Sequence, residues 1–292
     1  MKFGIAVPNF GLYANREQIL EISGLAEELR YDSLWVSDHV VIPVPHKVFG
    51  DTFHDPLVTL AYIAAVTDKL ELGTSVMVLP YRNPLVLGKM VSTLDTLSRG
   101  RVILGVGTGW IEGEFEALGV NFKERGKVTD EYIEILKELW TSENPEYNGK
   151  YLEFSNIKFL PKPERKPHPP IWVGGESAGA MKRAVKYGDG WHPVGLTPEA
   201  FREKAEYLKS LLPADKKDDF VLSLRRNIEI NDGREFSADD TLRGGREKIT
   251  KGIREYGDAG VEHLVLYILA GDYKGILNTL RVFAEEIRPG FE

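Results

Sequence analysis

Asp38 and His39 are the adjacent pair of side chains in this sequence that is best suited to acid–base chemistry. Histidine titrates close to neutral pH, so it can donate a proton or hydrogen-bond a cofactor, and a neighbouring carboxylate can support its charge. The pair follows residues 33–37, which we predict to form a strand, so it lies at the carboxyl end of that strand. A pair that only stabilises the fold would show the same residues in the same place. Both the functional and the structural interpretation stay open at this point.

Two glycine-rich segments provide backbone that a ligand could approach closely. The first, residues 105–109, reads Gly-Val-Gly-Thr-Gly, but Trp110 stands where the dinucleotide fingerprint G-x-G-x-x-G requires its third glycine. A Rossmann domain is therefore disfavoured. The second, residues 174–177, reads Gly-Gly-Glu-Ser and precedes a helix predicted to begin at Ala178, where free amides and a hydroxyl could bind an anion. Tight turns without a ligand remain the alternative for both segments.

Residues 70–113 form the unit around which the rest of the chain is organised. This unit divides into a strand, a helix and a second strand, at residues 72–80, 84–97 and 100–105. Such a right-handed βαβ unit implies a parallel sheet with helices packed outside it, and ligands bind at the carboxyl ends of its strands. Ser75-Val76 and Thr108-Gly109 should then lie near that end, on two neighbouring strands.

Strand and helix patterns alternate along the whole chain, and eight of each are the number that closes a TIM barrel. Asn15 and Asp55 are expected to begin helices, the second with Leu57, Leu60, Ala61 and Ala64 facing inward, and Thr129 is expected to begin another. Residues 142–170 interrupt the alternation with an Asn148-Gly149 hairpin signal and with Pro161, Pro163, Pro167, Pro169 and Pro170. We predict one α/β domain over residues 1–292, a (β/α)8 TIM barrel with this insertion between its fourth helix and fifth strand.

Composition narrows the class of protein. The chain has 292 residues, 42% of them hydrophobic, a net charge of −7 and no cysteine. The negative charge argues against nucleic acid as a partner, and the lack of cysteine excludes thiolate metal sites. Neither an apolar run long enough to span a membrane nor a signal-peptide pattern is present, so we expect a soluble, cytoplasmic protein that acts on a small molecule. A metal-dependent barrel hydrolase is disfavoured because residues 6–9 read Ala-Val-Pro-Asn where it would carry His-x-His.

Taken together, these segments resemble the luciferase-like monooxygenase superfamily, and within it the branch that uses the deazaflavin coenzyme F-420. The resemblance covers nearly the whole chain. It is carried by Trp35-Val-Ser-Asp-His39, Gly73-Thr-Ser-Val-Met-Val-Leu-Pro-Tyr-Arg-Asn-Pro84, Leu97-Ser-Arg-Gly-Arg-Val-Ile-Leu-Gly-Val-Gly-Thr-Gly-Trp110, Glu114-Phe-Glu-Ala-Leu-Gly119, Arg125-Gly126 with Asp130-Glu131, and Pro170-Ile-Trp-Val-Gly-Gly175. It implies an oxidoreductase with a flavin or deazaflavin ring in the barrel mouth, and a homodimer paired through residues 57–65 and 84–94.

The resemblance also assigns roles to individual residues. Asp38 and His39 would flank the ring as the catalytic pair, with His39 stabilising or protonating the reacting system. A non-prolyl cis peptide would join Ser75 to Val76 behind the ring. The remaining cofactor contacts would come from Thr108, Gly109 and Trp110 at the ring and its side chain, and from Gly174, Gly175, Glu176 and Ser177 at the phosphate. Some F-420 dehydrogenases carry a catalytic glutamate in place of Trp110, so here either Glu112 or Glu114 replaces it or no residue does.

Coenzyme F-420 is the expected cofactor and FMN the alternative, the latter with a monooxygenase activity that uses O2. Both carry a phosphate on a ribityl chain, whereas only F-420 adds an oligoglutamate tail that favours nearby cations. Candidates for those cations are Lys182, Arg183, Arg225 and Arg226. A non-catalytic flavin-binding relative is a lesser alternative.

Overall fold

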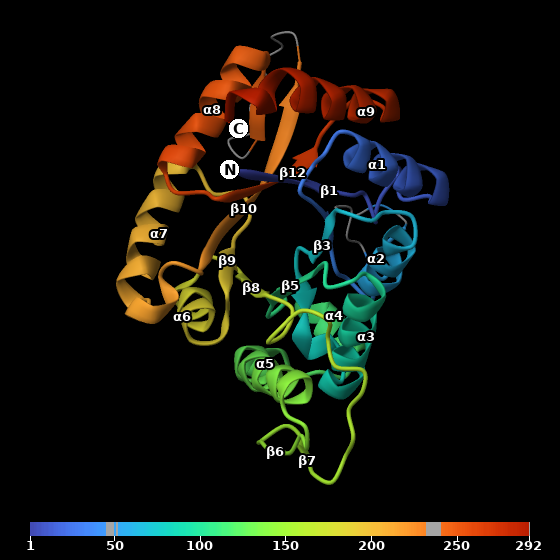
Figure 1. Cartoon of the computed structure of the whole chain (residues 1–292), viewed down its shortest axis with the longest axis vertical. Helices are drawn as coiled ribbons and strands as arrows, with labels where there is room; N and C mark the ends of the chain where they lie inside the picture. Colours follow the sequence, from blue (N-terminus) through green and yellow to red (C-terminus); the bar gives the residue numbers. More distant parts are fainter. Residues whose placement is uncertain (45–49, 51, 232–240, 292) are drawn as a thin grey trace.

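The computed structural model is a closed barrel of parallel strands with helices around it (Figure 1). It describes residues 1–44, 50, 52–231 and 241–291. The eight barrel strands, in order around the ring, are β1 (Lys2–Ala6), β2 (Ser33–Val36), β3 (Glu71–Thr74), β5 (Val102–Gly107), β8 (Ile171–Gly174), β9 (Gly190–His192), β10 (Val221–Ile230) and β12 (His263–Ile268). Strand β12 pairs with β1 and closes the ring. The predicted TIM barrel is confirmed.

Eight helices in the described part of the chain cover the barrel, as predicted. They are α1 (Arg16–Glu28), α2 (Pro56–Ala64), α3 (Pro84–Leu97), α5 (Arg125–Thr141), α6 (Ala178–Tyr187), α7 (Pro198–Leu211), α8 (Arg246–Asp258) and α9 (Tyr273–Val282). A short additional helix, α4 (Glu112–Ala117), follows β5 and was not predicted. The expected caps are present, since the Asn15 side chain accepts from the Gln18 amide and the Asp55 side chain from the Leu57 amide.

Two sequence-based details about the helices were wrong. Helix α5 begins at Arg125 and not at Thr129. Thr129 is an interior residue of this helix, and its hydroxyl donates to the Arg125 carbonyl. Helix α2 turns Ala61 to solvent and buries Ile63 instead. Threonine can stand at a helix start or inside a helix, and alanine can face the core or the solvent. The packing of the neighbouring elements decides which of these occurs.

The segment predicted as one strand over residues 72–80 is divided. Strand β3 ends at Thr74, the predicted cis peptide joins Ser75 to Val76, and β4 (Met77–Val78) then pairs with β5. A 3-10 turn at Leu79–Tyr81 follows. The chain leaves the ladder where the Thr74 hydroxyl donates to the Gly105 carbonyl, 2.7 Å away. Val76 is thereby placed at the carboxyl end of the barrel.

The insertion at residues 142–170 contains the predicted hairpin, which lies beyond α5 at one edge of the molecule (Figure 1). Strands β6 (Tyr147–Asn148) and β7 (Glu153–Phe154) are antiparallel. Residues 149–152 form the loop, so Asn148 pairs in the ladder and does not lie in the turn. The Glu131 carboxylate of α5 accepts three backbone amides of this loop. A further short strand, β11 (Thr241–Gly244), extends the sheet beside β10.

Aromatic rings fill the inside of the barrel. Trp35 is fully buried, and its ring centroid lies 5.2 Å from that of Trp172 and 4.8 Å from that of His192. Space for Trp35 exists because two strands carry glycine beside it. A Cβ at Gly73 would come within 2.3 Å of the indole and one at Gly4 within 2.6 Å. The packed interior separates the two ends of the barrel.

Candidate active site at the carboxyl end of the barrel

A cavity of about 570 Å³ opens at the carboxyl ends of the barrel strands. Segments far apart in sequence meet there: 37–39 after β2, 75–78 after β3, 107–110 after β5 and 174–177 after β8. All the predicted site residues line this cavity except Glu176, whose side chain is exposed outside it. Parallel strands that end at one face explain the convergence. Of the long loop 40–54, residues 45–49 and 51 lie outside the described residues.

His39 is held by a carboxylate from the additional helix α4. Its Nδ1 lies 2.7 Å from Glu114 Oε2. The imidazole makes edge contacts with the rings of Phe53 and Trp110, at 5.3 Å and 6.2 Å between centroids. Trp110 itself is 61% exposed at the cavity mouth. Because Nδ1 is engaged by Glu114, Nε2 is the nitrogen through which His39 can exchange a proton with a ligand.

Glu114 is fully buried and accepts four hydrogen bonds. In addition to His39, the Val40 amide (2.6 Å), the Val41 amide (3.2 Å) and the Tyr81 hydroxyl (2.9 Å) donate to its carboxylate. Burial opposes ionisation, but these donors outweigh it and hold the pKa of Glu114 below its usual value. An ionised Glu114 can therefore fix the His39 ring and balance a positive charge on it. The other candidate, Glu112, is exposed and does not line the cavity.

Asp38 is engaged by an arginine that sequence reasoning had not selected. Arg82 donates to both oxygens of Asp38, at 2.7 Å and 2.8 Å, and to Asp55 at 2.9 Å. The Val78 amide donates to Asp38 as well, at 2.9 Å. Burial disfavours the charged guanidinium, but the bonds to Asp38 and Asp55 outweigh it and raise the pKa of Arg82. Through Arg82, Asp38 thus connects the end of β2 and β4 to the start of α2.

Val76 lies against glycines on two neighbouring strands. A Cβ at Gly107 would come within 2.6 Å of Val76 Cγ2, and one at Gly174 within 2.9 Å of Val76 Cγ1. Only glycine leaves enough room at these positions for the Val76 side chain. The result is a smooth apolar floor along β3, β5 and β8, of the kind that a flat ring can lie against.

At the side of this floor where β8 meets α6, the backbone and side chains are arranged as an anion-binding site requires. Gly175 adopts a φ of +94°, and the Ser177 side chain caps α6 by accepting from the Ala180 amide. The first turn of a helix offers unpaired amides and the positive end of its dipole. Arg183 of α6 lines the cavity beside this turn, paired with Asp130. These groups could hold a phosphate.

The four cations proposed for an acidic tail are placed differently from one another. Arg183 and Arg225 line the cavity, whereas Lys182 and Arg226 do not. Lys182 is exposed on α6, and Arg226 is buried, with its Nη1 donating to the Gly195 carbonyl. Arg225 extends from β10 into the barrel mouth and donates to the Ser37 hydroxyl at 2.9 Å and to the Ser75 carbonyl at 3.2 Å.

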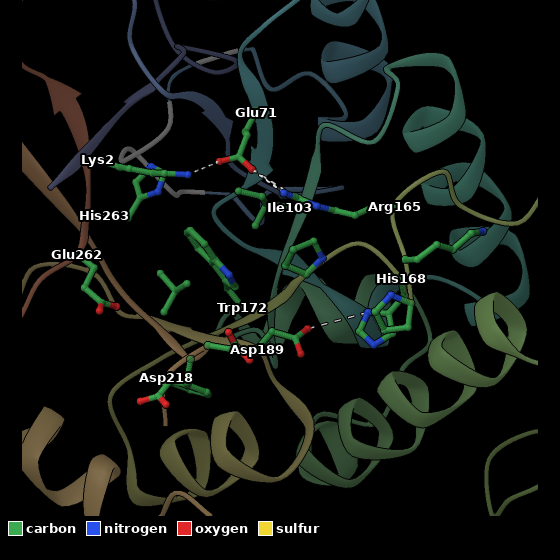
Figure 2. A pocket seen from close by; sticks show the side chains of 16 residues that line it. Lys2, Glu71, Ile103, Arg165, His168, Trp172, Asp189, Asp218, Glu262 and His263 are labelled. Carbon is green, nitrogen blue, oxygen red and sulfur yellow. Dashed lines mark hydrogen bonds and ion pairs between the residues drawn. The ribbon is translucent and has the colours of Figure 1, made fainter. Parts of the chain in front are cut away.

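A second cavity, of about 450 Å³, lies at the amino end of the barrel. Figure 2 shows Glu71 between Lys2 and Arg165, and His168 beside Asp189. Arg165 and His168 thereby join the end of the insertion to the first residue of β3 and to Asp189 before β9, and none of the predicted site residues is among these pairs. In the described ranges no group of acidic, histidine and cysteine side chains could hold a metal ion, and no helix is long and apolar enough to cross a membrane.

Comparison with known proteins gives one consistent family. The model of the luciferase-like monooxygenase family matches residues 1–235. An F-420-dependent glucose-6-phosphate dehydrogenase of Amycolatopsis mediterranei is 35% identical over 75% of this chain and 67% of its own length. An FMNH2-dependent dimethylsulfone monooxygenase of Pseudomonas putida is 29% identical over 57% of this chain and 46% of its own length. The structure of the F-420-dependent tetrahydromethanopterin reductase of Methanopyrus kandleri superposes with a TM-score of 0.83 at 17% identity, covering 100% of this chain and 99% of that one.

Proposed function

Because this chain belongs to the luciferase-like monooxygenase family, we propose that it is an oxidoreductase that uses coenzyme F-420 to transfer a hydride to or from a small organic substrate. One observation carries the proposal: the carboxyl-end cavity combines the Glu114–His39 pair with the capped first turn of α6 and a glycine-lined floor between them. An acid–base group, a phosphate site and a flat surface are what a phosphorylated redox ring requires of its protein.

Different residues of the cavity would bind the cofactor and transfer the proton. Ser177 and the first amides of α6 would hold the phosphate, and the floor around Val76 would support the ring. The bound cofactor supplies hydride transfer. His39 would give a proton to, or take one from, the reacting heteroatom through Nε2, while Glu114 keeps its ring in place.

FMN is the second candidate cofactor, with O2-dependent monooxygenation as its activity. The relative from Pseudomonas putida supports this alternative, and the first turn of α6 would serve the phosphate of either molecule. F-420 is preferred because the dehydrogenase shares higher identity over more of the chain. The sugar phosphate named for that dehydrogenase is not carried over, since Trp110 replaces the catalytic glutamate of some F-420 dehydrogenases.

The test is equilibrium binding of F-420, FMN and riboflavin to the purified apoprotein. We expect F-420 to bind more tightly than FMN, and FMN more tightly than riboflavin, which lacks the phosphate. Ser177→Glu places a negative charge at the first turn of α6 and should weaken F-420 and FMN by roughly tenfold or more while leaving riboflavin unchanged. Ser155→Glu, at an exposed position of the insertion, is the matched control and should change none of the three. Failure of both F-420 and FMN to saturate the wild-type protein would exclude the proposed function.

A further inference from the structure

Arg225 is a cation in the cavity that no carboxylate of the described residues balances. Its partners in the described part of the chain are two neutral oxygens, the Ser37 hydroxyl and the Ser75 carbonyl, together with the face of the Tyr267 ring, 4.9 Å from the guanidinium carbon. Its Nε is buried and has no hydrogen-bond partner. Burial lowers the pKa of Arg225, because the surrounding groups do not repay the loss of water.

Among the residues that the structure describes, the other charges that line the cavity are matched. Asp38 is paired with Arg82, and Arg183 is paired with Asp130. Glu114, which lies behind the cavity wall, is bonded to His39. Arg225 therefore gives this part of the cavity an excess positive charge. An unbalanced cation in a protein interior is unfavourable, and an anion that enters the cavity and binds the cation removes that cost.

We propose that Arg225 binds the negative charge that appears on the pyrimidine end of the cofactor ring when the ring is reduced. This inference rests on the proposed function. An oxidised flavin or deazaflavin that accepts a hydride gains two electrons and one proton. If no further proton is added, the product is an anion, and its charge is shared between N1 and the C2 carbonyl oxygen. Arg225 would bind this anion more strongly than the oxidised flavin ring, which is neutral, and this difference favours the reduced form of FMN.

Position favours the ring over the phosphate as the partner of Arg225. The phosphate geometry belongs to the junction of β8 and α6, whereas Arg225 rises from β10. Its guanidinium donates to the Ser75 carbonyl, which belongs to the peptide unit leading directly to Val76 and the floor. A charged group of the substrate is the other anion that could reach Arg225, and the experiment below separates the two sources.

The experiment compares wild type with Arg225→Met, Arg225→Lys and, as a control, Arg202→Met at an exposed position of α7. Dissociation constants are measured for oxidised FMN and, under anaerobic conditions, for chemically reduced FMN; the same pair is measured for F-420. The absorbance of the reduced, bound cofactor is recorded against pH, because the neutral and anionic reduced rings absorb differently. The melting temperature of each apoprotein shows whether it is folded.

In Arg225→Met we expect the preference for reduced over oxidised FMN to fall by roughly 10- to 100-fold, the usual contribution of a hydrogen bond to a charged group. The protonation midpoint of the bound reduced ring should rise. Arg225→Lys should keep part of the preference, and Arg202→Met all of it. The melting temperature of the Arg225→Met apoprotein should be equal to or above that of wild type, because the unbalanced charge is gone.

The inference is wrong if Arg225→Met binds both redox states with the wild-type ratio. An unchanged ratio together with a raised KM for the substrate would instead assign Arg225 to a substrate anion. Failure of the proposed function gives a different result, since the wild-type protein would then bind neither oxidised cofactor and there would be no ratio to compare.

Discussion

At the scale of single residues, the chemistry of the cavity depends on one histidine, His39, whose ring orientation is set by a carboxylate. Glu114 occupies Nδ1 of His39 at 2.7 Å and is itself fixed by two backbone amides and Tyr81. A carboxylate held in this way selects the ring orientation and supports the charged form, as the carboxylate partner of a catalytic histidine does in other enzymes. His39 can then act through Nε2 without losing its orientation.

Replacing His39 separates a catalytic role from a structural one. In His39→Asn we expect turnover to fall by roughly 10²–10⁴, the usual contribution of a general acid or base, while cofactor affinity stays within about tenfold. Cofactor affinity, melting temperature and turnover are measured on the same preparation. The control is His168→Asn at the amino-end cavity, which should keep turnover. Near-normal turnover in His39→Asn would remove His39 from the mechanism.

Replacing Glu114 tests the positioning of His39. Glu114→Gln keeps the shape but removes the charge, and turnover should fall by roughly 10- to 100-fold, as is typical for groups that orient a functional histidine. Tyr81→Phe removes one donor to the same carboxylate but leaves its charge, so turnover should change by only a few fold.

Glu114→Gln also changes how stability depends on pH. Because the pKa of Glu114 is lower in the folded state, its ionisation stabilises the fold above the unfolded-state pKa and this contribution is lost as the pH falls below it. The difference in unfolding free energy between wild type and Glu114→Gln should therefore be larger at neutral pH than below about pH 4. A difference that does not depend on pH would show that Glu114 is not ionised.

Residue types and their place at strand ends were enough to predict which side chains line the cavity. They did not predict which residues these side chains contact. Asp38 and His39 were selected correctly as cavity residues. Their partners, Arg82 and Glu114, are 44 and 75 residues away in the chain. Such pairings depend on how α4 and β4 fold back over β2, which local patterns do not encode. Arg225 was selected as a cation for a tail, whereas its depth in the barrel mouth became visible only in the structure.

At the scale of elements, the close packing of β3, β5 and β8 around Val76 explains why residue 107, at the end of β5, is glycine. Gly107→Ala would bring a methyl group within 2.6 Å of Val76 Cγ2, so a strand must shift. We expect a loss of about 1–3 kcal/mol in the free energy of unfolding and weaker cofactor binding. Denaturant unfolding and cofactor titration measure the two effects.

Two further variants decide whether this contact is the cause. Val76→Ala combined with Gly107→Ala should restore most of the lost stability, because the clashing methyl group of Val76 is then absent. Gly24→Ala in α1, where an added Cβ meets nothing within 4 Å, should instead stabilise the protein by about 0.5–1 kcal/mol. If Gly24→Ala and Gly107→Ala behave alike, close packing is not the reason for glycine at residue 107.

The order and type of the elements followed from the sequence because each repeats one pattern: a short apolar strand, then an amphipathic helix with a capping residue. The boundaries of the strands and helices were predicted less accurately. Residues 72–80 are apolar throughout, and nothing in that run marks where β3 leaves the ladder and β4 begins. Helix α5 begins before the expected Thr129 because the 3-10 turn at Phe122–Glu124 leads directly into it. Tertiary packing sets these element boundaries, and the local secondary-structure propensity of the residues does not predict them.

At the scale of the whole molecule, the outer faces of α2 and α3 expose apolar side chains on adjacent helices. Val58 is 64% exposed and Val86 is 57% exposed. The family resemblance predicts a homodimer through these helices, and a second copy of this chain would cover both side chains. Light scattering at micromolar concentration should find a dimer for wild type and a monomer for Val58→Glu with Val86→Glu. Leu160→Glu, at a position of the insertion that is 64% exposed, should remain a dimer. A monomeric wild-type protein would refute the prediction.

The inside of the barrel contains two buried histidines, which should make the whole fold sensitive to mild acid. Burial, together with the charges of His263 and Arg225, lowers the pKa of His192 to about 3, and burial together with Lys2 lowers that of His263 to about 3. His192 bridges the Ser75 and Ser223 hydroxyls, and His263 contacts Ser33, so within the described ranges neither has a carboxylate to balance a proton.

In the unfolded chain these histidines bind protons near pH 6.5, whereas in the folded barrel they do not until about pH 3. The unfolded state therefore takes up more protons as the pH falls below 6.5, and stability is lost over that range. Each histidine should reduce the free energy of unfolding by up to about 1.4 kcal/mol per pH unit between roughly pH 6 and pH 4. Urea unfolding at pH 7, 6, 5 and 4.5 measures this slope above the range where most carboxylates titrate. His192→Gln should remove about half of it, and a stability that is flat from pH 7 to pH 5 would show that the barrel interior accepts the protons.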